Sequence, residues 1–216
     1  MQVLCIEASA RVARSLSRQV GRRFVEQLTA HDPAISVTIR DVGSQPPPFV
    51  SEAFIAAAFT SEADRTDAQK SILSASDELI AEVLAADLIV IATPMYNYGM
   101  PAALKAWFDQ VIRIGRTFSF DLARGDFPLE PIQSGKTLVV IAAHGEFGFA
   151  PGGIREGWDH LVPHVLTAAR YLGVSRHHVV TIEYQEFGGE RHAKSVAAAL
   201  READRLAGEL ADAFAD

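Results

Sequence analysis

The chain of 216 residues has little cysteine, fewer cations than anions, and no long apolar segment. Its one cysteine, Cys5, cannot form an internal disulfide and lies in a predicted strand, so a buried and inert thiol is expected. The formal net charge of −7 argues against binding to nucleic acid or to an anionic membrane, because both depend on clustered Lys and Arg. No apolar run approaches the roughly 20 residues of a membrane span, and the N-terminus lacks a basic secretory signal, so we expect a cytoplasmic protein.

Glycine is absent between Met1 and Val20, where a dinucleotide-binding turn would need the pattern Gly-x-Gly-x-x-Gly. A usual NAD-binding Rossmann domain is therefore not expected. Ser134-Gly135-Lys136-Thr137 is similar to the end of a Walker A loop, but it precedes a predicted strand instead of a helix. His160 and His164 share a predicted helical face without a third ligand nearby, so no metal site is predicted.

Short β-branched runs alternate with amphipathic helical patterns, which is typical of βαβ units and a parallel sheet. The five strands are predicted at Gln2–Ala8, Ile35–Asp41, Asp87–Thr93, Thr137–Ala143 and His177–Glu183. The five long helices are predicted at Arg18–Thr29, Thr66–Ala85, Pro101–Ile114, Ile154–Leu172 and Ala193–Phe214. This pattern predicts one α/β domain over residues 1–216 with the flavodoxin-like, doubly wound strand order 2-1-3-4-5 and helices on both faces.

Local signals set several of the expected boundaries. Thr66 and Gln69 form a plausible capping box, and Gly115 lies where a left-handed residue would end the third helix. Pro163 is expected to bend or split the fourth helix. Two further segments, Gly43–Val50 and Asp121–Ser134, are predicted as loops.

The turn after the first strand is basic and rich in serine. Between Ser9 and Arg23 there is no acidic residue, and the arginines are Arg11, Arg14, Arg18, Arg22 and Arg23. A helix N-terminus here, together with the hydroxyls of Ser9, Ser15 and Ser17, would suit a phosphomonoester. The alternative is that Ser15 or Ser17 is a simple N-cap.

An aromatic turn follows the third strand, and its sequence is Pro94-Met95-Tyr96-Asn97-Tyr98-Gly99-Met100-Pro101. Ligands of open α/β sheets bind beyond the carboxyl ends of the strands, so these phenol rings, this amide and the backbone N–H groups could hold a flat heterocycle such as a flavin. Ala143-His144-Gly145-Glu146 ends the next strand and would flank the same ligand. His144 is either a group that tunes a reduced flavin or a structural loop residue.

Nothing in the sequence supports a protein nucleophile, because no Ser-His-Asp or Cys-His arrangement has local support. No catalytic side chain is therefore assigned. This absence suits a flavoenzyme, in which the cofactor carries out the redox step while the protein binds, orients and tunes it.

Over nearly its whole length the chain resembles the FMN-dependent NADH-azoreductases and the related quinone reductases of flavodoxin-like fold. The matching motifs are Ser9-Ala10-Arg11 with Ser15-Leu16-Ser17, Pro94-Met95-Tyr96-Asn97-Tyr98 with Pro101 and Leu104-Lys105, and Gly115-x-Thr117-Phe118. The resemblance implies that Ser9, Ser15, Ser17 and the backbone of Leu16 bind the FMN phosphate. It places the ring against Pro94, Met95, Tyr96, Asn97 and Tyr98, with backbone contacts from Ala143, His144, Gly145 and Glu146, where many members have Ser-Arg-Gly-Gly.

The resemblance also implies an activity. NADH or NADPH would supply electrons to quinones or to aromatic azo compounds in a ping-pong reaction, and the protein would be a homodimer. Two alternatives remain open: a carrier that uses FMN without its own NAD(P)H turnover, and a hydrolase. The sequence does not decide between NADH and NADPH, or between quinone and azo acceptors.

Overall fold

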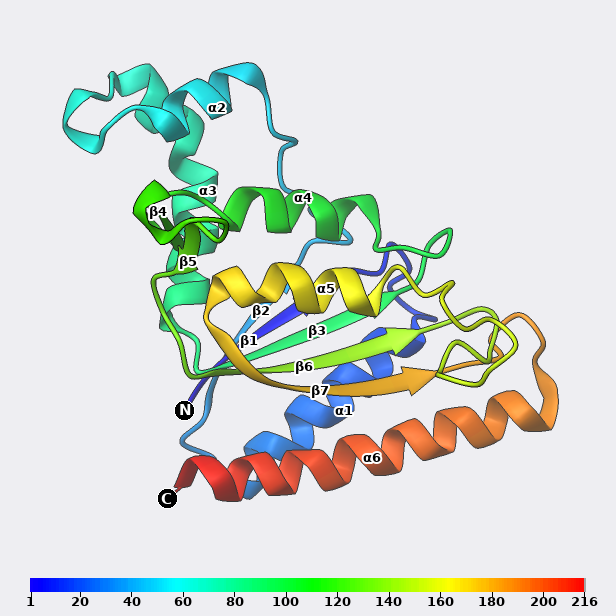
Figure 1. The fold of residues 1–216 in the computed structure, drawn as a ribbon. Helices are drawn as coiled ribbons and strands as arrows, with labels where there is room; N and C mark the ends of the chain where they lie inside the picture. The colour runs from blue at the N-terminus through cyan, green and yellow to red at the C-terminus, as the bar shows by residue number, and fades with distance from the viewer. Residues whose placement is uncertain (216) are drawn as a thin grey trace.

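A computed structural model describes residues 1–215 of the chain (Figure 1). Its centre is a parallel sheet of five strands in the order β2-β1-β3-β6-β7. The strands are β1 Gln2–Glu7, β2 Ser36–Asp41, β3 Leu88–Pro94, β6 Lys136–Ala143 and β7 Val174–Ile182. The predicted order 2-1-3-4-5 is confirmed. The largest shift in a strand boundary is at β7, which begins at Val174 instead of His177.

Helices cover both faces of this sheet (Figure 1). Helices α1 Leu16–His31 and α6 Gly189–Ala215 pack on one face, and α3 Asp67–Ala85, α4 Ala102–Val111 and α5 Val162–Ala169 pack on the other. Each face has its own apolar core, because alternate side chains of a strand point to opposite sides. The predicted capping box at Thr66 and Gln69 is present at the start of α3.

The middle strands are almost wholly apolar and buried, as expected for strands covered on both faces. Cys5 of β1 lies among them as a free, buried thiol. Burial, more than the nearby carboxylate of Glu7, raises the pKa of this thiol to about 12. The expected burial of this thiol is therefore confirmed. The raised pKa disfavours the thiolate, which is the reactive form.

Helix α1 lies unusually close to β3. A Cβ atom added at Gly21 would come within 2.9 Å of the Cβ atom of Ala92. Such a separation leaves no room for a side chain at position 21 unless the helix or the strand shifts. Two small residues therefore set the distance between the first helix and the third strand of the chain.

The predicted end of the third helix is wrong. Helix α4 ends at Val111, whereas the sequence pattern places the end at Ile114. The hydroxyl of Thr117 donates to the Val111 carbonyl and accepts from the Arg113 N–H, so a side chain takes the place of the next helical turn. Gly115 does have a left-handed backbone, with φ of 72°, but it serves a turn in which its N–H donates to the Phe118 carbonyl.

The fourth helix is also shorter than predicted, because residues 154–157 form turns and residues 158–161 have no regular secondary structure. The Asp159 carboxylate accepts from the N–H groups of Leu161 and Val162, and Pro163 occupies the first turn of α5. Proline is favoured in a first turn, where its missing N–H costs nothing. Pro163 thus starts a short helix instead of bending a long one, and the 3-10 helix Arg170–Leu172 follows.

Two strands, one α-helix and two 3-10 helices come from segments without a helical or strand prediction. Strands β4 Phe118–Phe120 and β5 Leu129–Pro131 form an antiparallel pair around the 3-10 helix Leu122–Arg124. Strand β5 and this 3-10 helix lie in the predicted loop Asp121–Ser134, and β4 directly precedes it. Helix α2 Glu52–Phe59 packs on the start of α3, projects beyond the sheet, and is followed by the 3-10 helix Glu62–Asp64. Its run of alanines has no amphipathic stripe, so periodicity could not reveal it.

Candidate functional site

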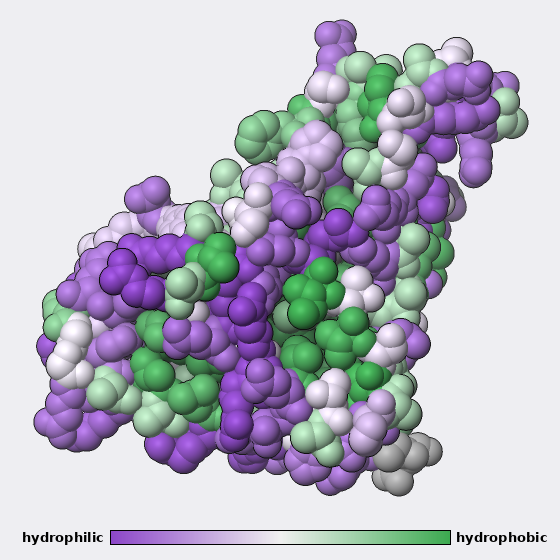
Figure 2. Space-filling model, turned by 180° about the vertical axis from the view of Figure 1, so that it is seen from behind, coloured by the Kyte–Doolittle hydropathy of each residue, from purple (hydrophilic) through white to green (hydrophobic). Residues whose placement is uncertain are grey.

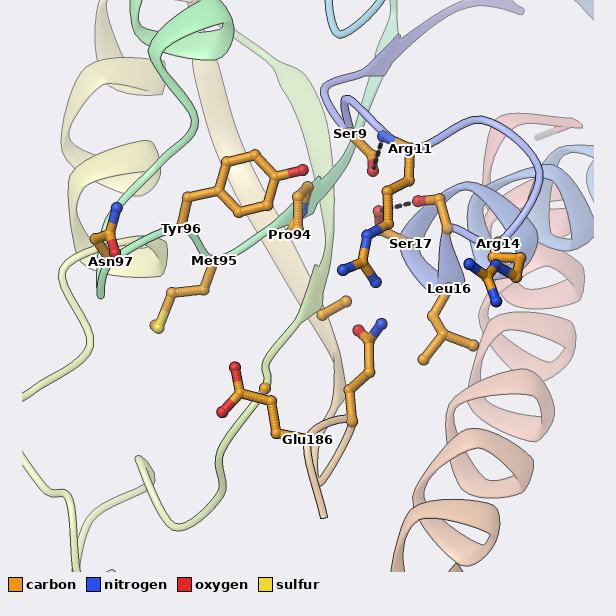
Figure 3. A pocket seen from close by; sticks show the side chains of 14 residues that line it. Ser9, Arg11, Arg14, Leu16, Ser17, Pro94, Met95, Tyr96, Asn97 and Glu186 are labelled. Carbon is orange, nitrogen blue, oxygen red and sulfur yellow. Dashed lines mark hydrogen bonds between the residues drawn. The ribbon is translucent and has the colours of Figure 1, made fainter. Parts of the chain in front are cut away.

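A cleft of about 450 Å³ lies at the carboxyl edge of the sheet, where four strand ends meet. Its walls are the turn from Ser9 to Ser17 after β1, the segment Pro94–Asn97 after β3, Ala143 and Gly145 after β6, and Gln185 and Glu186 after β7. Figure 3 shows Met95, Tyr96 and Asn97 on one side of the hollow, facing Arg11, Leu16 and Ser17. Segments distant in sequence therefore share one site.

The β1 turn is arranged as an anion site. Ser15 is the N-cap of α1, and its hydroxyl lies 3.2 Å from the buried Ser17 hydroxyl. The N–H groups of Leu16 and Ser17 belong to the first helical turn, which precedes the first intrahelical hydrogen bond. Ser15 is thus both an N-cap and part of the cleft wall, so the two interpretations of this serine are compatible.

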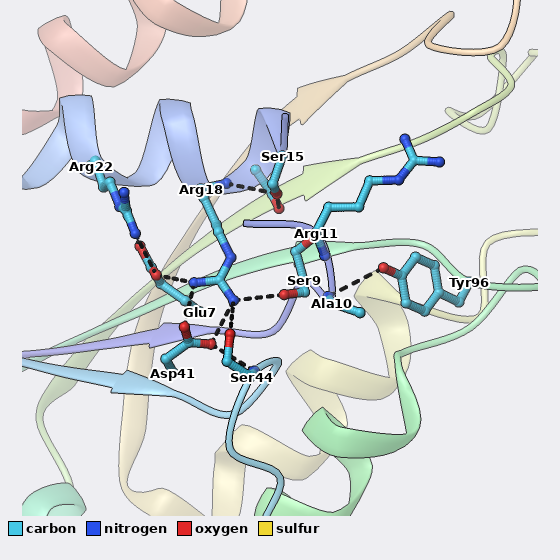
Figure 4. Close-up of polar contacts among 11 residues, drawn as sticks. Glu7, Ser9, Ala10, Arg11, Ser15, Arg18, Arg22, Asp41, Ser44 and Tyr96 are labelled. Carbon is cyan, nitrogen blue, oxygen red and sulfur yellow. Dashed lines mark hydrogen bonds and ion pairs between the residues drawn. The ribbon is translucent and has the colours of Figure 1, made fainter. Parts of the chain in front are cut away.

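The five arginines of this region divide into two groups. Arg18 is 1% exposed and makes ion pairs with Glu7 and Asp41, and Arg22 also pairs with Glu7 (Figure 4). Arg23 pairs with Asp204 of α6. Arg11 and Arg14 line the cleft instead. Only these two cations are placed to attract an anion there.

Arg18 also supports the turn itself. Its guanidinium donates to the Ser9 carbonyl at an N···O distance of 2.6 Å (Figure 4). Burial alone would raise the pKa of Asp41, but its hydrogen bonds to Arg18 and Ser44 and the Arg18 charge outweigh burial and lower that pKa to about 2. An ion-paired buried arginine therefore fixes the backbone from which the Ser9 side chain enters the cleft.

The β3 turn is tight and strained. Tyr96 and Gly99 exchange two backbone hydrogen bonds of 2.9 and 3.1 Å, which leaves Asn97 and Tyr98 as the central residues. Both are left-handed, with φ of 48° and 64°, a conformation that asparagine tolerates and tyrosine rarely adopts. The Tyr96 hydroxyl accepts from the Ala10 N–H at 3.3 Å, so the β1 and β3 turns are joined across the cleft (Figure 4).

The β6 turn contributes fewer residues to the cleft than the sequence predicts. Ala143 and Gly145 line the cleft, but Tyr98 and Glu146 border a smaller cavity of about 260 Å³ beside it. The Glu146 carboxylate accepts from Arg155 at 2.7 Å and from the Tyr98 hydroxyl at 3.0 Å. His144 lines neither cavity. It is 2% exposed and packs against Phe149, which fits the structural alternative for this residue.

The structure thus brings most predicted residues into the cleft and adds four that were not assigned to the site, although Arg11 and Arg14 belong to the basic turn identified in the sequence. The residues placed in the cleft are Ser9, Ser15, Leu16, Ser17, Pro94, Met95, Tyr96, Asn97, Ala143 and Gly145. The added residues are Arg11, Arg14, Gln185 and Glu186. The rule that ligands bind beyond strand ends applies to β7 as well, and it could have found Gln185 and Glu186.

Acidification should destabilise the protein through His144. Burial lowers the pKa of this imidazole, which Asp159 and Glu183 offset only in part, and neither ring nitrogen has a hydrogen-bond partner among residues 1–215. Below about pH 6.5 the unfolded chain therefore binds a proton that the folded chain refuses, at a cost of at most about 1.4 kcal/mol per pH unit. Urea unfolding of His144→Leu should show a smaller loss between about pH 7 and pH 5 than the parent. The exposed His164→Leu should match the parent, and equal losses for all three proteins would contradict this role.

Residues 1–215 contain neither a cluster of metal ligands nor a helix suited to a membrane. No three His, Cys, Asp or Glu side chains are grouped so that they could hold a metal ion. None of the helices in this range has the length and apolar character to cross a membrane.

Comparison with known proteins gave consistent matches. Residues 1–207 match a protein family described as having a flavodoxin-like fold. The chain is 54% identical to FMN-dependent NADH:quinone oxidoreductase 2 of Idiomarina loihiensis, over 91% of this chain and 82% of that protein. It is 39% identical to FMN-dependent NAD(P)H:quinone oxidoreductase 1 of Pseudomonas aeruginosa, over 87% of this chain and 89% of that protein.

Solved structures agree with the fold. An azoreductase of Bacillus anthracis superposes with a TM-score of 0.85 at 22% identity, covering 97% of this chain and 99% of that one. An FMN-dependent NADH-azoreductase of the same species, solved in complex with FMN, superposes with a TM-score of 0.84 at 16% identity, covering 98% of this chain and 100% of that one. At these identities the likeness shows a shared fold.

Proposed function

Because the chain belongs to the flavodoxin-like-fold family that contains FMN-dependent NADH:quinone oxidoreductases, we propose that it is an FMN-dependent NAD(P)H oxidoreductase acting on quinones and aromatic azo compounds. One observation carries the proposal. A single cleft joins an anion-binding turn after β1 to an aromatic and amide-bearing turn after β3. These are the two chemistries that a phosphorylated flat heterocycle requires.

The residues present fit FMN. The hydroxyls of Ser9, Ser15 and Ser17 and the N–H groups of Leu16 and Ser17 are suited to a phosphate dianion, with Arg11 and Arg14 on the same wall. Pro94, Met95, Tyr96 and Asn97, with Ala143 and Gly145, are suited to a planar ring. Tyr98 and Glu146 belong to the proposal as residues of the adjoining cavity, and His144 as a buried support beneath the β6 turn.

Bound FMN would supply two-electron redox chemistry, which no side chain of the cleft can provide. The role of the protein is to bind FMN and to orient it. The Asn97 amide and the Tyr96 ring form one wall, and the backbone of Ala143 and Gly145 forms another. Because both ends of the cleft belong to the ends of buried strands, the rigid sheet fixes their spacing.

Donor and acceptor would use the same cleft in turn, so that NAD(P)⁺ leaves before the acceptor binds. One cycle converts NAD(P)H, a proton and a quinone into NAD(P)⁺ and a hydroquinone. Two cycles convert an azo compound, two NAD(P)H and two protons into two amines, with solvent as the proton source. Initial rates measured at several fixed acceptor concentrations should give parallel double-reciprocal lines, and intersecting lines would reject this order.

The proposal includes a cytoplasmic homodimer. Large apolar side chains are exposed on the projecting α2 region, namely Phe49 at 74% and Phe59 at 72%, and on the β4–β5 hairpin, where Phe127 is 83% exposed. Figure 2 shows hydrophobic residues in separate clusters on one face of the molecule. Association would cover such groups. Light scattering of the purified protein should return twice the mass of one chain, and a single-chain mass would contradict the dimer.

The direct test is spectroscopic. Purified protein is incubated with FMN and desalted, its visible spectrum is recorded, and NADH and NADPH are added separately under argon. We expect a yellow protein that either nucleotide bleaches and that a quinone or an azo dye restores. A yellow protein that neither nucleotide bleaches would be an electron carrier, and a protein that retains no FMN would overturn the cofactor assignment.

The phosphate end of the cleft can be tested by Ser17→Ala. Loss of one hydroxyl donor to a dianion should weaken FMN binding about tenfold, because hydrogen bonds to charged groups contribute roughly 1.5–3 kcal/mol. Ser74→Ala, on the exposed surface of α3, removes the same hydroxyl far from the cleft and should bind FMN as the parent does. Fluorescence titration of FMN measures both, and equal dissociation constants would show that Ser17 does not contact the phosphate.

A further inference from the structure

The smaller cavity adjoins the main cleft and differs from it in character. The two share Met95, Asn97, Gly145 and Glu186, and the smaller one adds Tyr98, Glu146 and Phe149. Its walls therefore combine a thioether and two aromatic rings with carboxylates. Arg11 and Arg14 line the main cleft and not the smaller cavity, Glu146 lines only the smaller cavity of the two, and Glu186 lines both.

Two carboxylates border the smaller cavity, but only one of them has a charge partner. Glu146 is paired with Arg155 at 2.7 Å. Within residues 1–215, Glu186 makes no ion pair and its carboxylate accepts no hydrogen bond. Its Oε1 atom lies over Gly145, within 2.6 Å of the place where a Cβ atom on that glycine would stand. The net charge of this cavity wall is therefore that of Glu186.

The segment that carries Glu186 is firmly held. Three N–H groups donate to the β6 turn, from Tyr184 to Glu146 at 3.1 Å, from Gln185 to His144 at 3.3 Å, and from Glu186 to Gly145 at 2.9 Å. Tyr184 has a left-handed backbone, with φ of 67°. Its ring stacks on that of Phe147, with the two ring centroids 4.4 Å apart.

A cation completes this support. The Arg191 guanidinium of α6 lies 5.1 Å from the Phe147 ring centroid and 5.0 Å from that of Tyr184. Cation–π contacts of this kind add to aromatic stacking. The backbone at position 186 is thus fixed against the β6 turn, and Glu186 lines both cavities.

We infer that Glu186 is a specificity-determining residue that selects acceptors by charge. The smaller cavity receives the aromatic acceptor, and the carboxylate favours uncharged or cationic compounds over anionic ones such as sulfonates. Specificity of this kind comes from a repulsive element as much as from an attractive one. The inference rests on the proposed reductase function.

The test compares Glu186→Gln with the parent on two probes of similar shape, anthraquinone-2-sulfonate and the uncharged 2-(hydroxymethyl)anthraquinone. Binding to the FMN-loaded protein is followed by the flavin absorbance without any electron donor. kcat/KM is then measured with NADH. For Glu186→Gln at low salt, the association constant for the sulfonate divided by that for the uncharged probe should be about fivefold higher than for the parent, and the ratio of the two kcat/KM values should rise equally. This increase should be smaller in about 0.5 M NaCl, because salt screens exposed charges.

Glu190→Gln is the matched control. It removes the same charge four residues further along the chain, at the start of α6, where Glu190 pairs with Lys194 on the surface. Its probe ratio should equal that of the parent. A Glu186→Gln ratio equal to the parent's, or an equal rise in both variants, would overturn the inference. A parent that binds both probes but reduces neither would contradict the proposed function, while the binding ratio would still decide the role of Glu186.

Discussion

Arg18→Met should lower the free energy of unfolding by about 3 kcal/mol, because breaking a buried ion pair leaves a charge without compensation. Glu7 is 1% exposed, and after the substitution only the half-exposed Arg22 would remain as its partner. The Ser9 carbonyl would also lose its bond to the guanidinium, so FMN affinity should fall together with stability. Urea unfolding and FMN titration measure the two effects.

Arg23→Met provides the comparison within the same helix. Arg23 makes two hydrogen bonds to Asp204, as Arg18 does to Asp41, but the side chains of Arg23 and Asp204 are 43% and 37% exposed. Exposed ion pairs contribute about 0–1 kcal/mol. If both substitutions cost the same, burial of Arg18 would not be the source of its effect. A parent-like FMN affinity in a folded Arg18→Met would show that the Ser9 turn needs no support from the guanidinium.

Gly43→Ala should destabilise the protein by about 2–3 kcal/mol through overpacking and should weaken FMN binding more than tenfold. A Cβ atom at this position would lie 2.1 Å from the Ser9 carbonyl oxygen and 2.5 Å from its carbon. Both are backbone atoms, so a rotamer change cannot relieve the collision. The β1 turn must move, and the hydroxyl of Ser9 moves with it.

Gly99→Ala is the control for Gly43→Ala, because it also replaces a glycine with alanine but causes no steric collision. A Cβ atom at Gly99 would meet nothing within 4 Å. Its free energy of unfolding should stay within about 0.5 kcal/mol of the parent, as for most surface substitutions. Thermal unfolding of both variants checks the contrast. If Gly43→Ala keeps the parental stability and FMN affinity, the contact between position 43 and the β1 turn has no functional role.

The strand order and the turns that face the cleft could be predicted from sequence because they depend on strong local signals. Strands such as β3 and β6 are unbroken apolar runs, and the turns that follow them occupy one edge of any parallel sheet. Helix ends were less predictable. The end of α4 depends on the Thr117 hydroxyl and the start of α5 on the Asp159 carboxylate, and periodicity does not register either contact.

The roles of the arginines in the basic segment could not be predicted from the sequence either. In sequence, Arg11 and Arg18 are equivalent cations of one basic segment. In the fold, Arg18 of α1 forms an ion pair with Asp41 of β2, whereas Arg11 lines the cleft. Only tertiary pairing separates them. Glu186 differs from the arginines, because its position after β7 could have been inferred from the rule for strand ends, but its segment carries no recognisable motif.

The contact between Gly21 and Ala92 has a consequence for ligand selection. Helix α1 presents the phosphate-binding end of the cleft, and β3 leads into the turn at its other end. The distance between those ends, and so the length of molecule that can reach both, is fixed where the two elements touch in the core. A larger side chain at either position would lengthen that span without altering any residue of the cleft.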